Sequence, residues 1–207
     1  MFDLDGTLCD PGPGITESIK FALSEVGIIE DDYEKLKAFV GPPLNHTFAA
    51  QYGMNENEIS RVTSLYRKRF AEEGIHHYSP YPGIKTLLDK LSEKGTELIV
   101  ATSKIEPFAR EILRSTDLIK YFSFLSTNLP RHPEDKEVTI ARALNHYGKK
   151  ISRAVMIGDK EHDVIGAKAN GIDSIGVLWG YGSLEEIQRI APTHMIRNVE
   201  ELQIILK

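Results

Sequence analysis

The chain opens with two carboxylates in a setting that suits metal binding and nucleophilic attack. Asp3 and Asp5 stand two positions apart after two apolar residues, so in a strand their side chains point to the same side of the backbone. Gly6 then permits a sharp turn, and Thr7 adds a hydroxyl group. Neighbouring carboxylates repel each other, and a divalent cation relieves that repulsion. The pattern therefore predicts a metal site in which one acid can also act as a nucleophile, with a surface Asp-Gly turn as the alternative.

Further polar residues follow apolar runs later in the chain. Thr102 and Ser103 end one such run, and Asp159 ends another. Asp163 comes four residues after Asp159, so a helix beginning at Asp159 would carry both carboxylates on one face. Each residue alone could be a helix cap or part of a turn. Because ligands bind beyond the carboxyl ends of the strands in an open α/β sheet, the repeated placement predicts one shared site.

The elements that must position these residues alternate between strand and helix after residue 80. Short apolar runs indicate buried parallel strands, and apolar residues at helical spacing indicate the helices between them. Ser183 with Glu186, and Asn198 with Glu201, have the spacing of helix-start caps. We therefore expect an α/β fold with a doubly wound parallel sheet and right-handed crossovers. The expected strands cover residues 98–101, 121–125, 154–157 and 174–178, and the expected helices cover residues 84–91, 108–113 and 136–147.

Residues 15–79 interrupt this alternation and indicate a helical insertion. They contain several amphipathic segments, of which the clearest carries apolar residues from Ile59 to Phe70 on one face. They contain no convincing strand, and breaker-rich segments at residues 11–14 and 80–83 flank them. We therefore expect an α/β core domain formed by residues 1–14 and 80–207, and an inserted α-helical cap domain formed by residues 15–79.

The composition is typical of a folded protein without a dominant surface charge. The 207 residues are 41% hydrophobic and 27% charged, with a net charge of −5 and a pI of about 5.8. No global positive field attracts nucleic acid or an anionic membrane, so we expect neither as a partner. The single cysteine, Cys9, excludes an internal disulfide and fits a reducing cytosol, and no apolar stretch is long enough to span a membrane. An anionic substrate would need local positive charge, from a metal or a well-placed lysine. We expect a cytoplasmic protein that is a monomer or homodimer.

The motifs together resemble those of the haloacid dehalogenase superfamily of phosphohydrolases. The helical insertion stands where that superfamily places its α-helical cap. The chain looks closest to the phosphoglycolate phosphatase-like group, which includes nucleotidases and pyrophosphatases. The resemblance implies a Mg²⁺-dependent phosphomonoesterase that acts on a small phosphorylated metabolite, such as phosphoglycolate or a nucleoside monophosphate. The segments similar to the superfamily's motifs are Asp3-Leu4-Asp5-Gly6-Thr7, Thr102, Lys136 and Gly158-Asp159 with Asp163.

The resemblance also implies a role for each motif residue. Asp3 is the expected nucleophile that forms an aspartyl-phosphate, and Asp5 is the expected acid and base for the leaving group and the attacking water. Mg²⁺ is expected to be held by Asp3, by Asp159 and by the backbone carbonyl of Asp5. Asp163 is expected to act indirectly, by orienting a metal-bound water or Lys136. The expected substrate-binding residues are Thr102, Ser103 and Lys136.

Several alternatives stay open at this stage. A phosphomutase (β-phosphoglucomutase-like) or a pyrophosphatase would use the same residues. A receiver-like phospho-aspartate signalling domain also groups Asp, Thr or Ser, and Lys on an α/β sheet. Lys136 is favoured over Lys149 and Lys150 because it opens a helix before the strand expected over residues 154–157, whereas they stand in the turn that leads into that strand. A solvated helix lysine is the alternative for Lys136. Lys104 either contacts substrate or faces solvent.

No chemical role is expected for three residues near the motifs, and the first strand is short. His162 is expected to point outward, and Trp179 and Tyr181 are expected to be aromatic residues of the core or its rim. Only Met1 and Phe2 precede Asp3, whereas the superfamily has four or five apolar residues there. We therefore expect either that the natural start lies upstream of Met1 or that the sheet tolerates a short strand.

Overall fold

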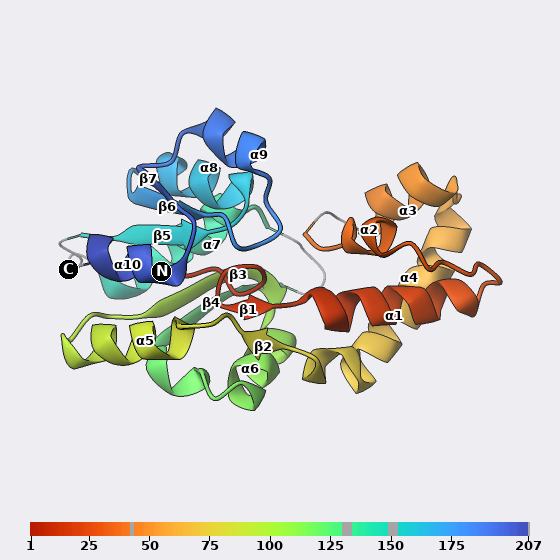
Figure 1. Ribbon diagram of the computed structural model, residues 1–207, viewed down its shortest axis with the longest axis horizontal. Helices are drawn as coiled ribbons and strands as arrows, with labels where there is room; N and C mark the ends of the chain where they lie inside the picture. The colour runs from red at the N-terminus through yellow and green to blue at the C-terminus, as the bar shows by residue number, and fades with distance from the viewer. Residues whose placement is uncertain (42–43, 130–133, 149–152, 207) are drawn as a thin grey trace. The chain divides into compact units, whose positions relative to one another are not determined.

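The computed structural model describes residues 1–41, 44–129, 134–148 and 153–206, which form two compact units (Figure 1). One unit comprises Met1–Asp10 and Pro80–Lys207, and the other comprises Pro11–Ser79. Residues 11–14, expected with the α/β core, therefore belong to the helical unit. The reason is that helix α1 (Gly12–Ser24) already begins there. Pro13 stands in its first turn, where a missing backbone N–H loses no hydrogen bond, so this segment starts a helix.

The α/β unit is built on a parallel sheet whose central position is held by Phe2. Phe2 forms parallel bridges with Val100 on one side and with Ile157 on the other. Its N–H donates to the Ile99 carbonyl and its carbonyl accepts from the Ala101 N–H, both at 2.8 Å. The predicted doubly wound parallel sheet is confirmed. Its order is β4 (Phe124–Asn128), β3 (Ile99–Ile105), Phe2, β5 (Val155–Gly158), β6 (Asp173–Val177) and β7 (His194–Ile196). Two short strands, β1 (Cys9–Asp10) and β2 (Ser79–Pro80), complete the set of described strands.

Helices cover both faces of this sheet. Helices α7 (Lys136–Tyr147) and α8 (Glu161–Ala169) pack on one face, and α5 (Ile84–Glu93) and α6 (Glu106–Ser115) lie on the opposite face (Figure 1). The strand predicted over residues 121–125 begins later than expected, because Tyr121 belongs to the 3₁₀ turn η2 (Ile119–Tyr121). The Tyr121 N–H closes this turn on the Leu118 carbonyl at 3.1 Å, so β4 begins later in the chain.

The last two helices begin at the residues that the sequence predicted as caps. The Ser183 hydroxyl accepts a hydrogen bond from the Glu186 N–H at 3.0 Å, and α9 (Leu184–Ile190) follows. The Asn198 side chain accepts from the Glu201 N–H at 3.0 Å, and α10 (Val199–Ile205) follows. Such caps satisfy N–H groups that have no partner within the helix.

The second unit is helical, as its amphipathic pattern predicted. Helix α4 (Glu56–Glu72) begins with a capping box in which Asn55 and Glu58 satisfy each other's backbone N–H groups. It buries Val62 and Phe70, and it packs against α1. These residues lie on the apolar face predicted between Ile59 and Phe70. The other helical elements described in this unit are α2 (Tyr33–Lys37), α3 (Leu44–Tyr52) and the 3₁₀ turn η1 (Gly74–His76).

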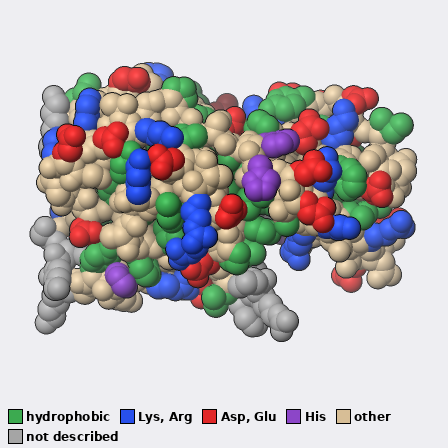
Figure 2. All heavy atoms as spheres, turned by 90° about the horizontal axis from the view of Figure 1, so that it is seen from below, with side chains coloured by type: hydrophobic (Ala, Val, Ile, Leu, Met, Phe, Trp, Pro, Cys, Tyr) green, Lys and Arg blue, Asp and Glu red, His purple; other side chains and the backbone are tan. Residues whose placement is uncertain are grey.

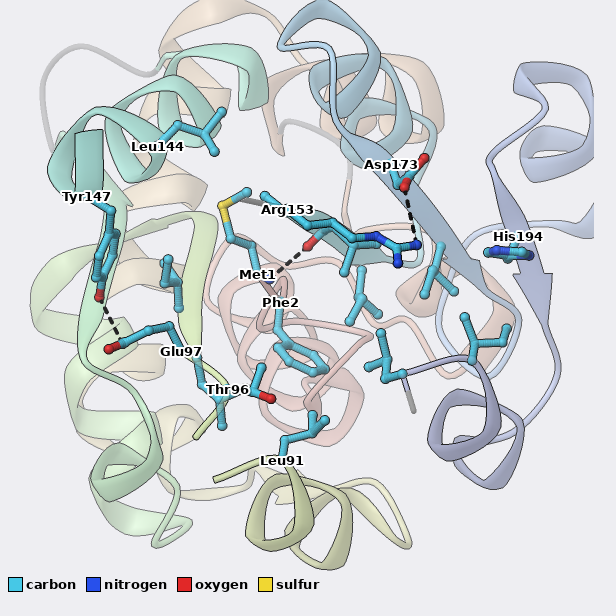
Figure 3. Close-up of a pocket in the computed structure, with 18 residues that line it drawn as sticks. Met1, Phe2, Leu91, Thr96, Glu97, Leu144, Tyr147, Arg153, Asp173 and His194 are labelled. Carbon is cyan, nitrogen blue, oxygen red and sulfur yellow. Dashed lines mark hydrogen bonds and ion pairs between the residues drawn. The ribbon is translucent and has the colours of Figure 1, made fainter. Parts of the chain in front are cut away.

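A cavity of about 620 Å³ lies at the amino ends of the strands in the α/β unit (Figure 3). The starts of β3, β5, β6 and β7 line it, together with Met1 and Phe2. Two polar pairs stand at its border: the Tyr147 hydroxyl donates to Glu97 at 3.5 Å, and Arg153 lies 3.8 Å from Asp173. None of the predicted site residues lines this cavity. It is therefore separate from the carboxyl ends of the strands, where the candidate site lies.

The surface carries both signs of charge. On the face shown in Figure 2, Lys and Arg side chains are interspersed with Asp and Glu, and no broad area is basic alone. Within the described ranges, no helix combines the length and apolar character that crossing a membrane requires.

Candidate active site

Five predicted residues meet at the carboxyl edge of the sheet. Asp3 follows Phe2, and Thr102 lies in the middle of β3, directly after its regular pairing with β4 ends at Ala101. Lys136 opens α7, and Asp159 follows β5. Asp163 lies in the first turn of α8. All five are buried. Four separate segments therefore converge here, and their side chains form a cluster of buried polar groups.

Lys136 forms the centre of this cluster. Its Nζ lies 2.8 Å from Asp3 Oδ1 and 2.8 Å from Asp163 Oδ1, and it donates to the Ala101 carbonyl at 3.0 Å. The Lys136 side chain is only 1% exposed. Burial acts to lower the pKa of Lys136, but the carboxylates of Asp163 and Asp3 outweigh it and raise that pKa above its ordinary value. A buried ammonium therefore stands beside Asp3.

The competing lysines, Lys149 and Lys150, lie outside the described residues. Among the described lysines, Lys136 is the one that contacts Asp3 through an ion pair.

Asp163 is held by the start of α8. Its Oδ2 accepts a hydrogen bond from the Lys160 N–H at 3.1 Å, as in a helix cap. Burial, supported by Asp3 and opposed by Lys136, raises the pKa of Asp163. Helix α8 begins at Glu161, so Asp159 precedes the helix, and the expectation that one helix carries both carboxylates is wrong. The physical reason is that Asp163 caps the N–H of Lys160, which fixes the helix start after Asp159.

Asp159 is enclosed by two loops that close around it. Its Oδ1 accepts from the Thr7 hydroxyl at 3.3 Å, and its Oδ2 accepts from the Tyr181 N–H at 2.8 Å. Gly6 has a φ of +79°, and a Cβ there would overlap the Asp159 carboxylate. A Cβ at Gly180 would likewise overlap the Asp159 carboxylate, and also the Gly6 carbonyl oxygen. The close approach of both loops to this carboxylate thus requires glycine.

The second of these loops, residues 179–182, is tied down at several points. The Trp179 indole N–H donates to the Thr7 carbonyl at 3.1 Å, and the Tyr181 hydroxyl donates to Asp10 Oδ1 at 2.6 Å. Lys160 Nζ donates to the Tyr181 carbonyl at 2.8 Å. Sequence reasoning assigned Trp179 and Tyr181 to the core or its rim and missed this supporting loop. The signal was present, because glycine alternates with the aromatic residues directly after a buried strand.

Asp5 and its neighbours occupy the more exposed part of the site. Asp5 Oδ2 lies 2.9 Å from Lys104 Nζ, with side chains 28% and 11% exposed. Lys104 therefore contacts a predicted catalytic residue and does not face solvent, and its contact with substrate stays a prediction. The Thr102 hydroxyl accepts from the Lys104 N–H at 3.2 Å. Ser103, between them, is exposed, and its role in substrate binding stays a prediction.

The donor set can hold a hard divalent cation. Ligand atoms of Asp3, His162 and Asp163 lie within 4.8 Å of one another. The Lys136 ammonium already stands between Asp3 and Asp163, however, and the His162 side chain is 43% exposed. Burial, together with Asp163 and Asp3, raises the pKa of Asp159 to about 7. No described lysine, arginine or histidine forms an ion pair with Asp159, and oxygen atoms lie around its carboxylate, so the region of Asp3 and Asp159 fits Mg²⁺ better.

We expect the metal-free protein to lose stability as the pH rises from about 4 to about 7. The ordinary pKa of the Asp159 carboxyl is 3.8 and its folded value is about 7. Between these values the folded state keeps a proton that the unfolded state releases, so the free energy of unfolding falls with rising pH, by at most about 1.4 kcal/mol per pH unit. Unfolding temperatures in EDTA at pH 5 and pH 8 measure this fall. Asp159→Asn should reduce it, and an equal fall in the variant would contradict the assignment.

Comparison with known proteins places the chain among enzymes. Residues 1–177 match the family described as haloacid dehalogenase-like hydrolase. The chain is 39% identical over 208 residues to a 5'-nucleotidase of Pseudomonas aeruginosa, covering 100% of this chain and 94% of that protein. It is 37% identical over 194 residues to the tyrosine-protein kinase PtkA of Mycobacterium tuberculosis, covering 93% of this chain and 66% of that protein. The solved structure of a haloacid dehalogenase-like family hydrolase from Streptococcus pneumoniae matches with a TM-score of 0.92 at 28% identity, covering 100% of this chain and 96% of that one.

Proposed function

The chain belongs to the haloacid dehalogenase-like hydrolase family, and on that premise we propose that this phosphatase hydrolyses a small phosphate monoester through an aspartyl-phosphate on Asp3. The observation that carries the proposal is the buried ion pair of 2.8 Å between Asp3 and Lys136. A carboxylate that attacks a phosphoryl group needs nearby positive charge, because the two anions repel each other.

In this proposal Asp3 attacks phosphorus, the bond from phosphorus to the leaving oxygen breaks, and the phosphoryl group is held on the Asp3 carboxylate. Lys136 offsets charge that develops on the phosphoryl oxygens. Thr102 accepts the Lys104 N–H at 3.2 Å, so its own proton can be donated to a phosphoryl oxygen. Water then attacks phosphorus and regenerates the Asp3 carboxylate, releasing phosphate.

Asp5 is proposed as the acid and base of both steps. Its side chain is 28% exposed, so it is more accessible than the buried nucleophile. A proton from Asp5 neutralises the leaving oxygen in the first step. Asp5 takes a proton from the attacking water in the second step.

Asp3, Asp159 and the backbone carbonyl of Asp5 are the proposed ligands for Mg²⁺. Oxygen donors are the ligands that this ion prefers, and Asp159 supplies a buried carboxylate that burial and its acidic neighbours destabilise in the charged form. When bound, the ion supplies positive charge that reduces the repulsion between Asp3 and the phosphate. Asp163 is proposed to act through Lys136, which it contacts at 2.8 Å.

We expect phosphate release from small phosphate esters with Mg²⁺, and a loss of at least about 100-fold when EDTA replaces the metal. The measurement is free phosphate from a panel that contains phosphoglycolate, nucleoside monophosphates, sugar phosphates and pyrophosphate. Magnesium added back in excess should restore the rate, which separates metal removal from unfolding. Turnover that EDTA leaves unchanged would contradict the proposed metal dependence.

The same panel tests the competing functions. An isomerised sugar phosphate without free phosphate would indicate a phosphomutase, and turnover confined to pyrophosphate would indicate a pyrophosphatase. A phosphorylated protein that is stable for minutes would indicate a receiver-like domain.

A further inference from the structure

We propose that Lys104 recognises a negative charge on the leaving group of the substrate. Preferred substrates would then carry a carboxylate or a second phosphoryl group close to the bridging oxygen. The inference rests on the proposed function, because it uses Asp5 as the acid that serves the leaving oxygen.

An irregularity in β3 places Lys104 at the site. Ala101 pairs with Ser126 and Ile105 pairs with Asn128, so β3 advances four residues where β4 advances two. The extra residues fall between Ala101 and Ile105, in the segment that contains Lys104. Bulges of this kind redirect side chains and are frequent beside active sites. The Lys104 N–H donates to the Thr102 hydroxyl, which holds the segment in this form.

The position of Lys104 is unusual for a lysine. Lysine side chains are mostly exposed, whereas the Lys104 side chain is 11% exposed and its Nζ lies 2.9 Å from Asp5 Oδ2. Lys136 is bound to Asp3, Asp163 and a backbone carbonyl inside the cluster. Lys104 is therefore the described lysine whose ammonium stands beside the proposed acid. It lies at the more open part of the site, where a leaving group can reach it.

The distances set how close the negative charge must be. A leaving oxygen that receives a proton from Asp5 lies about 2.6–3.2 Å from that carboxylate. Lys104 Nζ is 2.9 Å from the same carboxylate. An anionic oxygen two or three bonds from the leaving oxygen therefore falls within reach of the ammonium. Glycolate and phosphate leaving groups carry such an oxygen, whereas the nucleoside released from a nucleoside 5'-monophosphate carries a neutral ring oxygen there.

The test compares matched substrates in the full chain with Mg²⁺. The ratio of kcat/KM for phosphoglycolate to kcat/KM for 2-hydroxyethyl phosphate measures recognition of a carboxylate. A second ratio, with pyrophosphate in place of phosphoglycolate, measures recognition of a phosphoryl group. We expect at least one of these ratios to exceed about 10 in the wild-type protein. Lys104→Met should lower that ratio about 10-fold or more, because a charged hydrogen bond to the substrate is lost. Lys104→Arg should keep a larger part of the preference than Lys104→Met.

Controls separate this proposal from a structural role and from the proposed function itself. If Lys104 merely positioned Asp5, Lys104→Met would slow both substrates equally and leave the ratios unchanged, which would overturn the proposal. Wild-type ratios near 1 would also overturn it, while the hydrolysis would stand. The matched control is Lys120→Met, which removes a lysine ion-paired with Asp117 at 2.7 Å but 54% exposed, and its ratios should equal those of the wild type. No phosphate release from any compound would instead refute the proposed function.

Discussion

We expect Asp3→Asn to abolish phosphate release, with kcat falling by at least about a thousandfold. An amide cannot form the proposed aspartyl-phosphate, so the variant would lose the reaction path while keeping nearly the same side-chain shape. The measurement is free phosphate from the best substrate of the panel at saturating Mg²⁺. Incubation with substrate followed by mass spectrometry should show no phosphorylated protein.

The stability of this variant must be measured alongside its activity. Lys136 loses one of its two carboxylate partners but keeps Asp163 at 2.8 Å, so we expect the protein to remain folded. Circular dichroism and urea unfolding check this expectation. A folded Asp3→Asn protein that retains more than a few per cent of the wild-type rate would contradict the covalent route.

Lys136→Met should lower the free energy of unfolding by about 3–5 kcal/mol, because it leaves buried charges without their partner. The Asp3 and Asp163 side chains are 8% and 1% exposed, and both face the lost ammonium at 2.8 Å. Urea unfolding at pH 7 measures the loss. Phosphate release should also fall, since no other described lysine forms an ion pair with Asp3.

The double variant Lys136→Met with Asp163→Asn provides the matched control. It removes one of the two uncompensated carboxylates, so part of the lost stability should return. Activity should not return, because the cation beside Asp3 is still absent. Losses of stability that simply add would show that Lys136 and Asp163 do not act as a pair.

The periodic parts of the fold could be predicted from the sequence. Helix α7 spans Lys136–Tyr147 as its apolar spacing predicted, and the apolar runs before Asp159 and around Ile175 form β5 and β6. The family match over residues 1–177 and the parallel pairing of the strands confirm the predicted family and the predicted doubly wound sheet. The sheet could be predicted because burial of each apolar run allows few other arrangements. The roles of the site residues, the cytoplasmic location and the monomer-or-homodimer state stay predictions.

Features that depend on distant contacts could not be predicted. The bulge in the segment that contains Lys104 is defined by the pairing of β3 with β4. No local pattern in residues 101–105 predicts it. The conformation of the loop around Tyr181 depends on its hydrogen bond to Asp159, which lies 22 residues earlier in the chain. The start of α1 inside a segment rich in proline and glycine depends on Pro13 standing in a first turn. In each case the local sequence permits several structures, and tertiary contacts select one.

The enclosure of Asp159 also has a consequence for biosynthesis. Asp3 and Asp5 precede their partners in the chain, because the central strand pairs with residues near positions 100 and 157 and the supporting loop ends near position 182. A ribosome elongating at about 5–20 residues per second therefore synthesises Asp3 and Asp5 many seconds before these partners exist. The enclosure of Asp159 can form only after the residues near position 182 have been synthesised. A translation product that ends before these residues would carry the proposed nucleophile without the loop that encloses Asp159.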